Sequence, residues 1–88
     1  MIPAAEFPAL KAREVVRMLH RIGYELERQR GSHRKLVAPG RLAIGFAFHD
    51  SVEVPPRALR RMLVERAGLN DEEIADLLWR HRRTRGAT

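Results

Sequence analysis

Apolar residues recur at steps of three and four along the first part of the chain, and this period is typical of an amphipathic helix. The stripe consists of Ala12, Val15, Val16, Leu19 and Ile22. Charged residues fill most positions between them, so the pattern predicts a helix from about Leu10 to Ile22. Gly23 follows, and a glycine just past the last turn can adopt the left-handed conformation that ends a helix.

The period changes to two after Gly23, and the alternation of apolar and polar positions predicts three strands. We place these strands at residues 24–30, 33–38 and 41–49. The third strand separates large from small side chains, so its large residues should face the helices. These are Leu42, Ile44, Phe46 and Phe48.

Two short turn motifs separate the predicted strands. Gly31 and Ser32 suit a two-residue type II′ turn, because glycine accepts the positive φ of the first turn position. Pro39 and Gly40 suit a type II turn, in which proline presets the first φ and glycine supplies the positive one. The three strands should therefore form an antiparallel meander.

The second half of the chain predicts two further helices. Pro55 and Pro56 stand where proline is tolerated at a helix start, and an apolar stripe follows them. Asn70 can cap the last helix, with Glu73 three residues later as the second half of a capping box. The stripe of the first of these helices consists of Leu59, Met62, Leu63 and Ala67.

Together these elements predict one α+β domain over residues 1–88, in which two helices cover one face of a three-stranded sheet. This two-layer order is that of double-stranded-RNA-binding-like domains, here with an extra C-terminal helix. We expect residues 1–9 to form a loose N-terminal arm and residues 80–88 to form a basic tail. A chain this short buries a modest fraction of its surface, so a functional surface should be shallow.

The balance of charge is strongly basic and favours a polyanionic partner. Lys and Arg total 17 against 11 Asp and Glu, and all but two of the cations are arginine. Arginine suits planar, bidentate contacts to phosphate, which makes nucleic acid the first expectation.

The absence of cysteine fits a reducing cytoplasm and leaves neither a disulfide framework nor a thiolate metal site. No apolar run is long enough to span a membrane.

Two of the four histidines are candidates for chemistry. His33 opens the second strand and His49 closes the third, so the two can lie on the same side of the sheet if the register allows it. A zinc site would need a third ligand, and no residue supplies one at a convincing spacing. His20, on the polar side of the first helix, and His81, in the tail, are most simply surface residues.

A histidine among cations can cleave RNA without a cofactor. The imidazole of His33 can move a proton to or from a ribose 2′-hydroxyl or its leaving oxygen. Arg30, Arg34 and Lys35 can hold the phosphate and stabilise the developing charge. The hydroxyl of Ser32 is expected to hydrogen-bond the turn or a phosphate, since adjacent strand residues point to opposite faces.

The stretch Leu10–His33, with Gly23-Tyr24 followed by Arg28-Gln29-Arg30-Gly31-Ser32-His33, resembles the HicA family of mRNA interferase toxins from type II toxin–antitoxin pairs. The resemblance continues more thinly through His49 to residues 67–69. It implies a double-stranded-RNA-binding-like fold and ribosome-independent RNA cleavage, with a catalytic histidine after Gly-Ser that falls on His33. His49 is a possible assistant. The implied partners are an mRNA substrate and a HicB-like antitoxin, with operator DNA bound only through the toxin–antitoxin complex.

Two other functions remain open on the sequence. The same cations can serve a non-catalytic RNA-binding module in which His33 only donates a hydrogen bond. A lesser alternative is DNA binding through the helix of residues 56–67, whose basic face carries Arg57, Arg60 and Arg61.

Overall fold

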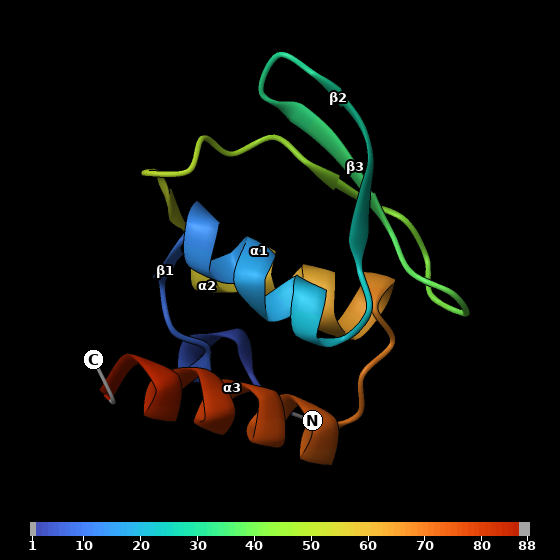
Figure 1. Ribbon diagram of the computed structural model, residues 1–88. Helices are drawn as coiled ribbons and strands as arrows, with labels where there is room; N and C mark the ends of the chain where they lie inside the picture. Colours follow the sequence, from blue (N-terminus) through green and yellow to red (C-terminus); the bar gives the residue numbers. More distant parts are fainter. Residues whose placement is uncertain (1, 87–88) are drawn as a thin grey trace.

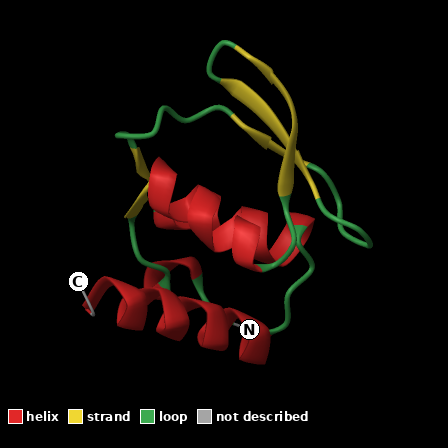
Figure 2. Ribbon diagram, in the orientation of Figure 1, coloured by secondary structure: helices red, strands yellow, loops and turns green. Residues whose placement is uncertain are grey.

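A three-stranded antiparallel sheet, covered on one face by helices, forms the upper half of the computed structural model, which describes residues 2–86 (Figure 1). The predicted α+β class is confirmed, including the extra C-terminal helix, and the fold is double-stranded-RNA-binding-like. Figure 2 shows the sheet on one side of the central helices and the last helix on the other side. The elements are η1 (Ala4–Glu6), β1 (Leu10–Lys11), α1 (Ala12–Arg21), β2 (Glu25–Arg30), β3 (His33–Val37), β4 (Ile44–Phe46), β5 (Glu53–Val54), α2 (Pro56–Arg60), η2 (Arg61–Arg66) and α3 (Asp71–Gly86).

Helix α1 follows the predicted apolar stripe but begins two residues later than expected. At its start the Lys11 backbone N–H donates to the Glu14 carboxylate at 3.0 Å, which is one half of a capping box. The predicted cap at Gly23 is confirmed, since its φ is 102° and the Tyr24 N–H donates to the Leu19 carbonyl at 3.1 Å. The residues of α1 that are buried are Ala12, Val15, Met18 and Leu19, while Val16 and Ile22 are partly buried.

The hairpin of β2 and β3 has the predicted turn. Gly31 has a φ of 61°, and Ser32 has a negative φ, as a type II′ turn requires. β3 is the central strand of the sheet and pairs with β2 on one side and β4 on the other. A one-residue irregularity at Glu27 shifts the register of β2 between Leu26 and Arg28.

The strand predicted at residues 24–30 is wrong in its burial. Only Tyr24, which precedes the strand, is buried, whereas every residue of β2 is exposed and Leu26 is 49% exposed. The hairpin rises beyond α1 in Figure 1, so no helix covers this part of the sheet. The alternation of β2 therefore reflects sheet geometry and not burial.

The third strand is much shorter than the predicted residues 41–49. Ile44 and Phe46 are buried as expected, but Leu42 is 56% exposed and does not face the helices. Arg66 explains the difference, because its guanidinium donates to the Ala43 carbonyl at 2.9 and 2.6 Å. These bonds tie the start of the expected strand to the end of η2 instead of to β3. The turn at residues 38–41 is confirmed by the bond from the Arg41 N–H to the Ala38 carbonyl at 3.2 Å.

Helix α3 extends well beyond the predicted end. Its start has the expected capping box, with the Glu73 N–H donating to Asn70 Oδ1 at 2.8 Å and the Asn70 N–H donating to Glu73 Oε1 at 2.9 Å. The expectation of a basic tail is wrong for residues 80–86, which are helical, and residues 87–88 lie outside the described part of the chain. No helix within residues 2–86 is long and apolar enough to cross a lipid bilayer.

Two segments that the sequence presented as surface features are part of the packed interior. His81 is 7% exposed, and its Nε2 lies 3.5 Å from Glu14 Oε1 of α1. The expected loose arm is also wrong for residues 2–9, since Phe7 is 3% exposed and joins the core. The chain then enters the short β1, which pairs with β5 in a second small sheet that the period-two pattern did not reveal.

Candidate functional site

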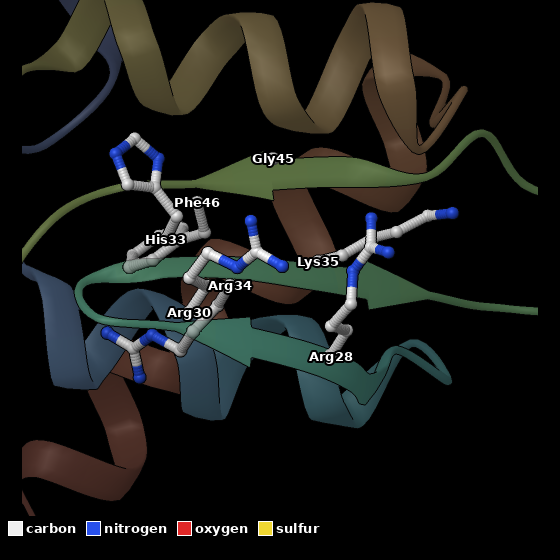
Figure 3. A pocket seen from close by; sticks show the side chains of 7 residues that line it. All are labelled: Arg28, Arg30, His33, Arg34, Lys35, Gly45 and Phe46. Atoms are coloured by element: carbon white, nitrogen blue, oxygen red, sulfur yellow. The ribbon is translucent and has the colours of Figure 1, made fainter.

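A shallow hollow of about 340 Å³ lies over the sheet face that points away from the helices (Figure 3). The three strands supply its lining, and four of the lining side chains are cationic. The lining residues are Arg28, Arg30, His33, Arg34, Lys35, Gly45 and Phe46. Figure 3 shows the His33 ring at one end of the hollow and the Arg28 and Lys35 side chains at the other.

The position of His33 follows from the hairpin turn. The two-residue turn at Gly31 and Ser32 makes His33 the first residue of β3, opposite Arg30 of β2. Lys35 is two residues further along the same strand, so it projects from the same face. The buried Leu36 projects from the other face into the core, which leaves His33 and Lys35 exposed to solvent.

Arg28 belongs to this site, and sequence reasoning missed it. Its register partner is Lys35, and it lies two residues from Arg30, so both arginines of β2 reach the exposed face. The signal was present in the sequence as a second arginine at a spacing of two. The irregularity at Glu27 hid it, because alternation counted from Tyr24 does not continue through a bulge.

The site carries positive charge with little local compensation. None of the residues lining the hollow is acidic. Glu27 compensates the charge of Lys35 in part, because Glu27 Oε1 lies 3.1 Å from Lys35 Nζ. Both side chains are about half exposed, so this ion pair is weak. A phosphate oxygen can therefore replace the Glu27 carboxylate as the partner of Lys35. Gly45 adds space, since nothing lies within 4 Å of the position that a Cβ would occupy.

Arg34 takes a different position from the other predicted phosphate ligands. Its guanidinium lies 5.0 Å from the centre of the Phe46 ring, and its Nη2 donates to the Phe48 carbonyl at 2.9 Å and to Asp50 Oδ1 at 3.0 Å. The Arg34 side chain is 16% exposed. These contacts hold the end of β4 and the following loop beside β3.

The structure does not bring His33 and His49 into one hollow. His49 and Ser32 lie with Asp50 in another depression, of about 350 Å³, beside the hairpin turn. Arg34 borders both depressions. Of the residues predicted from the sequence, His33, Arg30 and Lys35 therefore share the cationic hollow, with Arg34 at its border.

Fold and site together define a class of protein: a small basic domain of double-stranded-RNA-binding-like fold whose open sheet face carries a histidine among arginines and a lysine. The family model described as the HicA toxin of bacterial toxin–antitoxin matches residues 12–69. The match covers more than half of the chain, and the protein belongs to the HicA toxin family. It extends from α1 to the residues that follow η2 and ends before α3. Comparisons with curated proteins and with solved structures give no match.

Proposed function

We propose that this protein is a ribonuclease toxin that cleaves mRNA at the cationic hollow, with His33 as its catalytic residue. The observation that carries the proposal is the position of His33, which is exposed at the start of the central strand and shares the hollow with Arg28, Arg30 and Lys35. An imidazole and a cluster of fixed cations are the two components that metal-free cleavage of RNA requires.

The proposed reaction uses the internal nucleophile of RNA. The ribose 2′-oxygen attacks the adjacent phosphorus, the bond to the 5′-oxygen of the next nucleotide breaks, and the products are a 2′,3′-cyclic phosphate and a 5′-hydroxyl. His33 either accepts the proton of the 2′-hydroxyl or donates a proton to the leaving oxygen, and water completes the other transfer. Arg28 and Lys35 hold the phosphate oxygens and stabilise the charge that develops on them. DNA lacks the 2′-hydroxyl and is not cleaved.

Expression in bacteria tests this proposal. The wild-type chain should arrest growth and degrade mRNA, with 5′-hydroxyl ends at the cut sites, and His33→Ala should do neither while keeping the fold. His20→Gln is a matched control, because His20 is exposed on α1, away from the hollow, and its variant should remain toxic. Toxicity and mRNA cleavage that persist in His33→Ala would exclude His33 as the catalytic residue.

The family membership and the open cationic face also support a partner. We propose that a HicB-like antitoxin covers the hollow and neutralises the toxin, presenting carboxylates to Arg28, Arg30 and Lys35. Any binding of operator DNA would then belong to the complex of the two proteins. Copurification of the antitoxin with the wild-type chain, and protection of RNA in its presence, would test this step.

A non-catalytic RNA-binding module is the second candidate function. All six residues of β2 are exposed, and an uncovered basic hairpin can bind a phosphate backbone without cleaving it. This exposure therefore supports RNA binding but does not require catalysis. The two functions differ in one result. Equal RNA binding by wild type and His33→Ala, with intact RNA in both cases, would establish the binding module.

A further inference from the structure

The second depression, beside the turn that precedes His33, has a chemistry unlike that of the cationic hollow. Gln29 and Arg34 are register partners and project from the sheet face opposite to His33. The loop after β4 adds Phe48, His49 and Asp50 to the lining. The two depressions therefore lie on opposite faces of the same end of the sheet, with Arg34 at the border of both.

The charge of this second depression disfavours phosphate. Among the residues that line the second depression, Arg34 is the single lysine or arginine. The Arg34 guanidinium already contacts Asp50 Oδ1 at 3.0 Å. The Asp50 side chain is 67% exposed, so the carboxylate also faces solvent and would repel an anion. A neutral ligand fits this balance better than a phosphate does.

The remaining lining groups match a planar ligand with hydrogen-bonding edges. Phe48 is half-buried, and its ring meets that of Phe46 edge-on, with 5.5 Å between centroids and 66° between planes, so the apolar wall is fixed in place. Gln29 is held by its bond from Nε2 to the Gly31 carbonyl at 3.0 Å. His49 and Ser32 supply hydrogen-bonding groups, and Asp50 supplies an acceptor. Unpaired nucleobases are recognised in this way, by an aromatic or apolar wall and by bonds to their edges.

We propose that this depression binds an unpaired guanine of the RNA strand whose phosphate lies in the cationic hollow. The proposal rests on the proposed ribonuclease function and assigns it a base preference. Guanine follows from Asp50, because the guanine Watson–Crick edge offers two adjacent N–H donors to one carboxylate. His49 or Ser32 can then donate to the acceptor atoms of the same base.

The edge of the sheet gives the RNA a path between the two depressions. β4 is an outer strand, Gly45 is exposed within it, and Ala47 is exposed directly after it. No atom outside residues 44–46 lies within 4 Å of the position of a Gly45 Cβ, so a ribose–phosphate backbone can pass close to this strand. Larger side chains at these two positions would obstruct the passage.

Binding of RNA that cannot be cleaved tests the guanine preference directly. The probes are short single-stranded oligonucleotides with 2′-O-methyl groups, alike except for one central base, and the measurement is fluorescence anisotropy with the full chain. We expect the guanine probe to bind roughly tenfold more tightly than the adenine, cytosine and uracil probes. Equal binding of all four probes, or a preference for a different base, would overturn the proposal.

Three variants locate the preference. Asp50→Asn preserves the shape of the side chain but removes one acceptor, so the guanine preference should fall to within about twofold. His49→Ala should reduce it as well and leaves the Arg34 contacts intact. Glu53→Gln is the matched control, since it removes a neighbouring exposed carboxylate that does not line the depression. A preference that survives both Asp50→Asn and His49→Ala would place base recognition elsewhere.

These outcomes separate the inference from the proposed function. The 2′-O-methyl probes lack the attacking hydroxyl, so their binding does not depend on catalysis. If the chain prefers guanine but leaves ordinary RNA intact, the base-site proposal holds and the ribonuclease proposal is wrong. If the chain cleaves RNA but binds the four probes equally, the ribonuclease proposal holds and the base-site proposal is wrong.

Discussion

Tyr24 shows how much of the sheet depends on one side chain. It is 1% exposed at the junction between α1 and β2, and its hydroxyl donates to the Leu42 carbonyl at 2.7 Å. This bond, together with the one from Arg41 Nη1 to the Ala67 carbonyl at 2.7 Å, fixes the loop that leads into β4. No local pattern in the sequence indicated the bond from Tyr24 to a carbonyl 18 residues away.

Tyr24→Phe removes this hydrogen bond and preserves the ring. The Leu42 carbonyl loses its donor in a part-buried position, so we expect the free energy of unfolding to fall by about 1 kcal/mol. Urea denaturation followed by circular dichroism measures the change. A variant as stable as wild type would show that the bond does not contribute to stability.

The same residue predicts a pH dependence. Burial raises the pKa of Tyr24 above its ordinary value of 10.0, against a lowering effect of Arg41 and Arg66. The unfolded chain then ionises first as the pH rises, so the Tyr24 contribution to stability is present below about pH 10 and is lost above it. Between about pH 9 and about pH 11, wild type should lose more stability than Tyr24→Phe. Parallel loss in both proteins would contradict the raised pKa.

At the scale of elements, α3 is the part of the structure that the family match does not include. Its capping box was predicted correctly, because both halves of that interaction lie three residues apart in the sequence. Its length and the burial of His81 were not predicted. The approach of His81 to Glu14 joins α3 to α1 across 67 positions, and no local pattern encodes such a contact.

Ile74→Ala tests whether α3 is an integral part of the core. Ile74 is fully buried, and its truncation leaves a cavity that should cost about 2–5 kcal/mol of unfolding free energy. Trp79→Ala is the control on the same helix, because Trp79 is 56% exposed and its truncation should cost much less. Equal effects of the two substitutions in urea denaturation would mean that α3 is not packed as the structure has it.

At the scale of the whole molecule, the sequence predicted the layers correctly and misjudged their edges. The period-two pattern located β2 and β3 because the hairpin turn fixes their register. It overestimated β4 because Arg66, distant in the sequence, bonds the Ala43 carbonyl. His33 was predictable because it follows the turn, whereas Arg28 was hidden by a bulge.

The surface charge of the sheet predicts how binding responds to salt. Each cation that neutralises an RNA phosphate contributes a slope of about −0.7 to the dependence of log K on log salt for a single strand. Arg28→Gln should therefore make the slope shallower by roughly 0.7 with 2′-O-methyl RNA. Arg17→Gln removes an exposed arginine of α1 that does not line the hollow and should leave the slope unchanged. Identical slopes for the two variants would disprove phosphate binding at Arg28.

Cleavage of RNA by the purified chain in the presence of a metal chelator is the most direct test of the central claim that His33 performs the chemistry. The account predicts that wild type cleaves RNA under these conditions, that the cut ends carry 5′-hydroxyl groups, and that His33→Ala leaves the RNA intact while melting at the temperature of wild type. Loss of wild-type cleavage on chelation, or equal cleavage by His33→Ala, would contradict it.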